Sequence, residues 1–214
     1  MKNTLLALLS ATLLFSCGGE NKQENIEVPV EAGSEELSNL EKEHLLERAS
    51  YADSVNAGLA EDTFKGSARR EASGSFGDAI VTVNYGSPGK RGRVIWNGLV
   101  SYDQVWVSGS HWATAVTFSE DVVINEVEVA AGMYGFFTIP GREEWTLILN
   151  KNYDQHLADA YEESEDVVRV NVKPVELDQE VQRLTYGVEK VSDTEGAISL
   201  SWDQIKVSMP FIIK

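Results

Sequence analysis

The sequence predicts an all-β domain, a β-sandwich or jelly roll, that follows an export signal, a tether and an N-terminal amphipathic helix. Three observations support this fold class. Apolar residues alternate with polar ones in many segments after about residue 64, as in Ile198-Ser199-Leu200-Ser201-Trp202. Glycine and proline punctuate several of these segments, and no long helical pattern separates them. About ten short strands without intervening helices are typical of sandwiches and jelly rolls.

Residues 1–16 have the composition of a bacterial secretory signal. Lys2 supplies a positive charge, and residues 4–15 are apolar apart from threonine and serine. This run is shorter than the roughly 20 residues that a bilayer-spanning helix needs. A charged start followed by a short apolar run predicts export and cleavage.

The end of this signal predicts lipid attachment. Leu14-Phe15-Ser16-Cys17 resembles the lipobox of bacterial lipoproteins, in which the cysteine thiol receives a diacylglycerol and the signal is cut before it. Cys17 is the single cysteine of the chain, and an exported protein seldom keeps one unpaired thiol without a reason. We expect a lipid-anchored protein of the cell envelope, and Gly18 is compatible with transfer to the outer membrane. An ordinary cleaved signal with an incidental cysteine is the alternative.

Two further segments precede the β domain. Residues 17–33 are polar and acidic without an apolar period, which predicts a flexible, solvated tether. Residues 34–63 contain a predicted helix at 35–57, which Ser34 can cap and Gly58 can end. Its apolar stripe is expected to dock on the β domain, with self-association as the alternative, and consists of Leu37, Leu40, Leu45, Ala49, Ala52 and Val55.

Residues 64–214 form the predicted β domain. Alternation is clearest at 168–172, 198–202 and 205–209, where each segment has one apolar and one polar face. Residues 151–166 are polar, and this pattern predicts a long loop or a short helix. Further strands are expected near 79–85, 93–96, 104–107, 113–118, 121–129, 133–139, 145–149 and 181–190.

Composition and motifs exclude several classes of function. The chain has 18 Lys and Arg residues against 34 Asp and Glu residues, a net charge of −16, which argues against nucleic-acid binding. It has no Gly-x-Ser-x-Gly elbow, Walker loop, His-Glu-x-x-His motif or cysteine pair. His111 and His156, with Asp154 and Asp159 near the second, suit a transition metal, but nothing in their spacing brings them together. We therefore predict no catalytic residue, no metal and no cofactor.

One stretch of basic and aromatic residues is the candidate for ligand binding. Lys90, Arg91 and Arg93 suit a carboxylate, phosphate or acidic sugar, with pairing to the surplus acids as the alternative. Trp145 and Trp202 lie on the apolar phase of their strands and are predicted core residues, whereas Trp96, Trp106 and Trp112 cluster near the basic residues. The predicted ligand-binding residues are Tyr85, Arg93, Trp106, His111 and Trp112.

A series of motifs follows a specific order between about Phe64 and Phe211. They are Asn84-Tyr85-Gly86-Ser87-Pro88, Lys90-Arg91-Gly92-Arg93, Val105-Trp106, Gly109, Ala113-Thr114, Ala131-Gly132-Met133-Tyr134, Phe137-Thr138-Ile139-Pro140, Trp145, Asn150-Lys151 and Asp166-Val167-Val168-Arg169. This order resembles the family known as domain of unknown function 2911, which is common among lipoproteins of Gram-negative bacteria. The resemblance implies a β-rich fold and an envelope location, and it carries no established activity.

The chain departs from this family in two places. The family usually has an arginine where Ser87 stands. It usually reads Arg-Thr-Gly-Ala-Asn-Glu where residues 107–112 read Val-Ser-Gly-Ser-His-Trp. If the replaced polar groups form a family site, this protein has a different specificity or has lost the site.

The missing catalytic signatures favour a non-catalytic envelope module that binds a glycan, a small ligand or another envelope protein. One alternative is a hydrolase that uses His111 with carboxylates. Another is a structural interaction protein that acts through its amphipathic helix.

Overall fold

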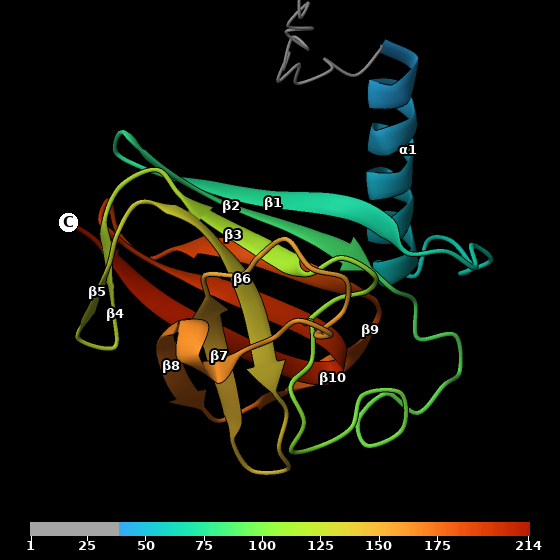
Figure 1. Cartoon of the computed structure of the whole chain (residues 1–214). Coiled ribbons are helices and arrows are strands. Elements are labelled where there is room, and N and C mark those ends of the chain that lie inside the picture. Colours follow the sequence, from blue (N-terminus) through green and yellow to red (C-terminus); the bar gives the residue numbers. More distant parts are fainter. Residues whose placement is uncertain (1–38) are drawn as a thin grey trace, which may run out of the picture. The chain divides into compact units, whose positions relative to one another are not determined.

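The computed structural model describes residues 39–214. One helix precedes two antiparallel sheets that pack face to face (Figure 1). The predicted all-β sandwich with an N-terminal helix is therefore confirmed. The predicted signal at 1–16, the lipid site Cys17 and the tether at 17–33 lie outside the described residues. Within the described part of the chain, no helix is long and apolar enough to cross a membrane.

Each sheet is a continuous antiparallel ladder. The six-stranded sheet has the order β1 (Ala68–Phe76), β2 (Ala79–Ser87), β3 (Thr114–Phe118), β6 (Gly132–Ile139), β7 (Trp145–Asn150) and β8 (Asp166–Val172). The four-stranded sheet has the order β5 (Val127–Val129), β4 (Val122–Ile124), β10 (Glu195–Ile213) and β9 (Val175–Lys190). A short 3-10 helix, η1 (Glu163–Glu165), lies in the segment between β7 and β8.

The core lies between the two sheets and follows from the period of two. On β2, Val81 and Val83 are fully buried, while Thr82 and Asn84 are half-buried on the opposite face of the sheet. Phe211 of β10 packs edge-on against Phe76 at 5.0 Å between ring centroids. The inner faces thus form one apolar layer. On the outer face of the six-stranded sheet, Phe137 of β6 and Ile148 of β7 are buried in a second apolar cluster with Val107 and Ala113. The outer faces of β1, β2 and β3 carry partly exposed side chains.

Helix α1 (Asn39–Asn56) contacts the sandwich through its last turns. Ala52 and Val55, two members of the predicted stripe, are buried. The side-chain amide of Asn56 donates to the carbonyl of Arg183 at 3.0 Å and to Oγ1 of Thr185 at 2.9 Å, both on β9. The expected docking of the helix on the β domain is present at this end.

Several strand predictions differ from the structure. The single strand predicted at 121–129 is a hairpin of two strands, β4 and β5. Residues 93–96 and 104–107 are loops, because their apolar side chains pack down on the core while the backbone forms only isolated bridges at Trp96 and Trp106. The segments at 198–202 and 205–209 belong to one strand, β10, which Asp203 interrupts as an irregularity with φ 54°. Strand β1 was not predicted, because its sequence is mostly polar and its buried face is short.

Candidate functional site

A cavity of about 510 Å³ opens beside the long segment 88–113, which joins β2 to β3. We call it the cationic cavity. Its wall comes from the chain before β1, from the 88–113 segment, from the loop that follows β7 and from β10. The lining residues are Lys65, Ser67, Pro88, Gly89, Arg91, Arg93, Leu99, Val100, Trp106, Val107, Gly109, Ser110, His111, His156, Leu157 and Trp202.

The charged side chains among the described lining residues have one sign. Lys65, Arg91, Arg93, His111 and His156 contribute cationic or imidazole groups, and none of the described lining residues is an aspartate or glutamate. The whole chain carries a net charge of −16. A local group of positive side chains in an acidic protein concentrates the field that attracts an anion.

The basic cluster predicted from sequence divides in two. Lys90 pairs with Asp203 at 2.6 Å and with Glu180. Burial alone lowers the pKa of Lys90, but hydrogen bonds to these two carboxylates outweigh it and raise the pKa overall. Lys90 is therefore occupied by the surplus acids and does not line the cavity.

The neighbouring arginines remain available at the cavity wall. Arg93 donates from Nε to the carbonyl of Lys90 at 3.1 Å and from its terminal nitrogen to the carbonyl of Gly89, so backbone oxygens orient it. Arg91 and Lys65 are exposed, and within residues 39–214 neither forms an ion pair. Their positive charges are not neutralised by a described carboxylate.

A buried hydrogen-bond cluster around Ser108 holds the wall of the cavity. The Ser108 hydroxyl donates to Oγ1 of Thr138 at 3.0 Å, and the Ser108 carbonyl accepts from Thr114 at 3.0 Å and from the Tyr186 hydroxyl at 2.8 Å. Burial raises the pKa of Tyr186 well above its ordinary value, so this phenol remains a donor. Ser108 itself has φ 54°, a left-handed conformation that the cluster stabilises.

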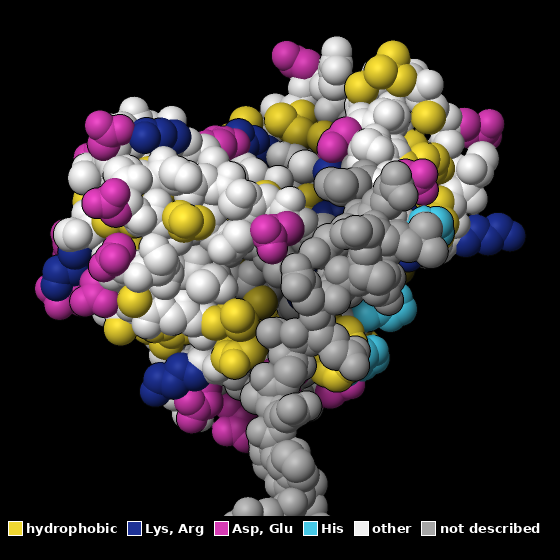
Figure 2. Space-filling model, turned by 90° about the horizontal axis from the view of Figure 1, so that it is seen from above, with side chains coloured by type: hydrophobic (Ala, Val, Ile, Leu, Met, Phe, Trp, Pro, Cys, Tyr) yellow, Lys and Arg dark blue, Asp and Glu magenta, His cyan; other side chains and the backbone are white. Residues whose placement is uncertain are grey.

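Two histidines far apart in sequence meet at the rim. The loop that follows β7 pairs with the segment before β3, with Leu157 N donating to the His111 carbonyl at 2.6 Å. The rings of His111 and His156 lie 6.4 Å apart, although the sequence spacing did not indicate this. Histidine side chains gather at one side of the molecule in Figure 2.

The contacts of this pair with described carboxylates are few. Nδ1 of His156 lies 3.5 Å from Oδ2 of Asp159, and both side chains are exposed. The imidazole of His111 has no hydrogen bond or ion pair with a described carboxylate, and no group of three potential metal ligands occurs within the described chain. A general base is usually oriented by a hydrogen-bonded partner, and none of the described carboxylates fills that place for His111.

Tryptophans form the apolar wall of the cavity. Trp106 stacks on Trp202 with centroids 6.0 Å apart and meets the edge of Trp96 at 5.9 Å. Trp145 and Trp202 are each 1 % exposed, as predicted for core residues, and Trp202 also lines the cavity. The indole nitrogen of Trp202 and the hydroxyl of Ser110 are buried without a hydrogen-bond partner in the described structure. Such groups are stabilised when a ligand or water supplies a partner.

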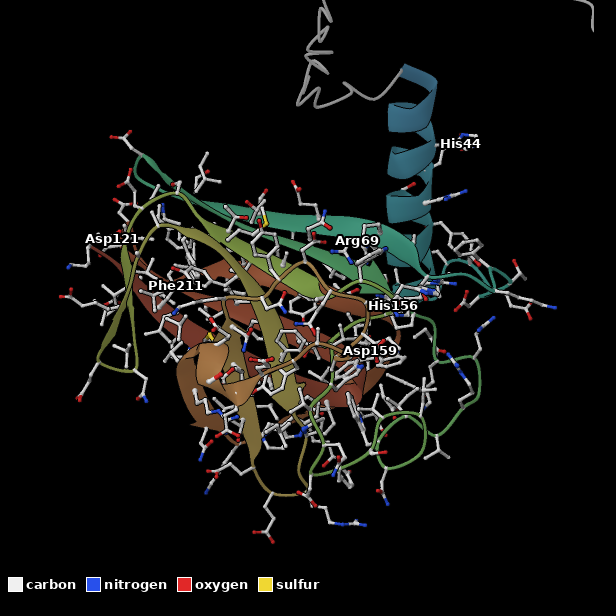
Figure 3. The ribbon with its side chains drawn as sticks, viewed as in Figure 1. His44, Arg69, Asp121, His156, Asp159 and Phe211 are labelled. Atoms are coloured by element: carbon white, nitrogen blue, oxygen red, sulfur yellow. The ribbon has the colours of Figure 1, made fainter. Side chains whose placement is uncertain are left out.

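A second hollow, of about 650 Å³, lies over the outer face of the six-stranded sheet, and we call it the outer groove. Its lining residues are Arg69, Glu71, Thr82, Asn84, Trp112, Ala113, Ala115, Thr117, Met133, Tyr153 and Asp154. A smaller hollow, the junction hollow, is lined by Ser67, Arg69, Gly86, Ser110, His111, Trp112 and His156. Figure 3 shows Arg69 and His156 close to each other at this end of the sheet.

The five predicted ligand-binding residues have different places. Arg93, Trp106 and His111 line the cationic cavity, and Trp112 lines the outer groove and the junction hollow. Tyr85 is 1 % exposed and packs against the ring of Tyr186, so it is a core residue that a ligand does not reach. Tyr85 faces the core together with Val81 and Val83, the alternate residues of β2. This alternation was already visible in the sequence.

Sequence reasoning did not assign several lining residues to the site. Lys65 lies in the linker before β1, and Tyr153 and Leu157 lie in the polar loop after β7. Tyr153 is an aromatic residue in an otherwise polar stretch, and this contrast is the sequence signal that would have singled it out. The structure leaves its ring exposed. The proximity of Lys65 depends on how the chain crosses the sandwich and has no local signal.

Comparison with known proteins places the chain in one family. A family model described as a protein of unknown function (DUF2911) matches residues 67–211. No curated protein and no solved structure matches the chain. The match runs from β1 into β10. It includes every described lining residue of the cationic cavity except Lys65.

Proposed function

The chain belongs to the DUF2911 family of proteins of unknown function, and from its cavity we propose that it is a non-catalytic binding module for an anionic ligand. The observation that carries this proposal is the lining of the cationic cavity. Five basic or imidazole side chains surround it, and its described lining includes no carboxylate. Arginine and lysine are the side chains that bind carboxylate and phosphate groups most strongly.

The apolar wall defines the rest of the ligand. The cavity also has apolar or aromatic surface, which comes from Leu99, Val100, Trp106, Leu157 and Trp202. Small-molecule sites combine such surface with a few polar groups that fix orientation. A sugar or another small organic molecule that carries one carboxylate or phosphate group fits this combination.

An enzymatic role has less support. The imidazole of His111 lacks a described carboxylate partner, and the two rim histidines are exposed. An exposed imidazole with no orienting group is poorly placed to activate a nucleophile. We therefore favour reversible binding over hydrolysis by His111.

The proposal includes the cell location that the sequence predicts. Lipid at Cys17 would hold the module on the envelope membrane, with the acidic tether at 17–33 between lipid and domain. Mass spectrometry of the mature N-terminus should find a diacylglycerol and an amide-linked acyl chain on Cys17. Cys17→Ser should release the protein into the soluble envelope fraction, and an unmodified cysteine in the native protein would contradict the anchor.

Calorimetry with three probes tests the binding function. Glucuronate and glucose 6-phosphate carry an anionic group, whereas glucose has the same ring without charge. We expect at least one anionic probe to bind more tightly than glucose, and its affinity to fall as salt is added because salt screens exposed charges. The preference between the two anions identifies the group that the cavity takes.

Matched variants locate the binding. Arg91→Gln removes an exposed lining charge that has no described ion pair, so the fold should be unaffected while affinity for the anion falls about tenfold, or about 1.4 kcal/mol. Arg142→Gln removes an exposed arginine that lies outside the cavity lining and serves as the control for net charge. Equal affinity for glucose and the anions, or equal loss in both variants, would refute the cavity as the site.

A further inference from the structure

We propose that the outer groove binds neutral sugar residues attached to the anionic group, so that the ligand is an oligosaccharide with a single acidic residue. This inference rests on the proposed anion-binding function of the cationic cavity. In this arrangement the acidic residue of the ligand binds in the cationic cavity, and its neutral residues bind in the outer groove.

The floor of the groove is the outer face of four adjacent strands. Glu71 of β1, Thr82 of β2, Thr117 of β3 and Met133 of β6 point away from the core, because their sequence neighbours point inward. Ala115 lies on the same face and is small. Short side chains on the central strand β3 leave the face hollow, which gives an extended ligand room to lie across the strands.

Two aromatic side chains border this hollow. Trp112 is 55 % exposed and Tyr153 is 42 % exposed, which is unusual for rings of this size in a folded domain. Exposed rings at the edge of a polar hollow provide flat apolar faces on which the C–H face of a sugar can pack. Burying part of each ring against a ligand contributes favourable free energy of binding. The hydroxyl groups of the sugar contribute less, because they exchange hydrogen bonds with water for hydrogen bonds with the protein.

Arg69 fixes the backbone at Trp112. Arg69 donates to the carbonyl of Trp112 at 3.0 Å and to the carbonyl of Ala113 at 2.9 Å, and its remaining contacts go to Asn84. The indole also meets the ring of His156 edge-on, with centroids 5.9 Å apart. A backbone that is fixed before binding loses less conformational entropy when a ligand packs on the ring, which favours a recognition role.

The charges of the groove differ from those of the cavity. Glu71 and Asp154 line the groove, and the guanidinium of Arg69 is occupied by backbone carbonyls and by Asn84. Carboxylates accept hydrogen bonds from sugar hydroxyls but repel a second anionic group. The groove therefore suits neutral sugar residues, and the acidic residue belongs in the cationic cavity.

The junction hollow connects the two surfaces. It shares Arg69 and Trp112 with the outer groove, and it shares Ser67, Ser110, His111 and His156 with the cationic cavity. Its volume is about 380 Å³. Because neighbouring hollows share these lining residues, the two surfaces lie next to each other, within reach of one extended ligand.

The experiment compares three ligands on the mature full-length protein by calorimetry. They are glucuronate, xylotriose, and a xylotriose that carries one glucuronate residue. We expect the acidic oligosaccharide to bind at least tenfold more tightly than glucuronate, because it fills the groove as well as the cavity, and xylotriose to bind more weakly than the acidic oligosaccharide.

Two substitutions separate the groove from the cavity. Tyr153→Ala should reduce the affinity ratio of the acidic oligosaccharide to glucuronate to near one, and Tyr102→Ala, at a tyrosine outside the groove lining, is the matched control and should leave the ratio unchanged. Trp112→Ala should act in the same direction as Tyr153→Ala.

The outcomes distinguish this inference from the function on which it rests. If glucuronate binds and the acidic oligosaccharide binds no more tightly, the groove inference is overturned while the anion site stands. If the ratio falls equally in the Tyr102 control, the groove is not the cause and the inference fails. If no acidic ligand binds and xylotriose alone does, the proposed anion function fails, and the joined site fails with it.

Discussion

Replacing Arg183 with methionine should cost more stability than any surface substitution. This guanidinium is 1 % exposed and joins the linker before β1 to β2 and β9. One terminal nitrogen, Nη2, donates to Oδ1 of Asp62 at 2.6 Å. The other, Nη1, donates to the carbonyls of Ser87 at 3.0 Å and Gly66 at 3.2 Å. Nη2 also donates to the Phe64 carbonyl. Methionine matches much of its volume but replaces none of these donors.

The expected magnitude follows from what remains behind. The Asp62 side chain is 7 % exposed, and its Oδ2 already lacks a hydrogen-bond partner among the described residues. Loss of Arg183 leaves this carboxylate buried without a counter-charge, which costs about 3–5 kcal/mol in comparable buried pairs. The total stability of a domain is typically about 5–15 kcal/mol, so this is a large fraction.

Urea unfolding followed by tryptophan fluorescence measures the effect as a shift in midpoint at constant slope. The double variant Arg183→Met/Asp62→Asn should recover about 1–3 kcal/mol, because the uncompensated charge is removed. Arg142→Met at an exposed position should change stability by less than about 0.5 kcal/mol. A loss of less than about 1 kcal/mol for Arg183→Met would refute the reasoning that this ion pair anchors the linker.

Three further predictions test the junction hollow, a half-buried phenol and the core. Gly86→Ala should weaken anion binding and lower stability by about 1–3 kcal/mol, measured by calorimetry and urea unfolding, because its Cβ would lie 2.5 Å from the Ser110 carbonyl oxygen. Burial and the hydrogen bond to Asp166 raise the pKa of Tyr161 to about 12, so its contribution to stability is complete below pH 10 and is lost as the pH rises towards 12. Tyr161→Phe should reduce the loss of stability over that pH range, and an unchanged pH profile would contradict this assignment. Phe211→Ala should cost about 3–5 kcal/mol in urea unfolding because it removes a fully buried ring, and a cost below about 1 kcal/mol would show that the core closes around the gap.

The strands that sequence predicted well have one apolar and one polar face. Alternation at 168–172 and at 198–202 predicted parts of β8 and β10, because the period of two is a local property of an extended chain. Strand β1 lacks this contrast, since most of its residues are polar or small. The loops that hold Trp96 and Trp106 resemble strands because their side chains are apolar, although their backbones are not paired within a sheet.

The candidate site was predictable where its residues are close in sequence. Arg93, Trp106 and His111 lie within one segment, and all three line the cationic cavity. Residues that are adjacent in sequence can nevertheless make different contacts. Lys90 pairs with acids of β9 and β10, whereas Arg91 lies at the cavity wall, and only the position of the distant carboxylates decides between them.

The sequence by itself determined the all-β class, the membership of the family, the helix that precedes the strands and the stretch that contributes most of the cavity wall. Each of these depends on local periodicity, composition or motif order. Only the tertiary structure decided that His156 meets His111 and that Lys65 joins the cavity. It also decided that, among the described residues, carboxylates line the groove but not the cavity. These arrangements depend on which strands pair and how long loops close, and such contacts between distant residues leave no local signal in the chain.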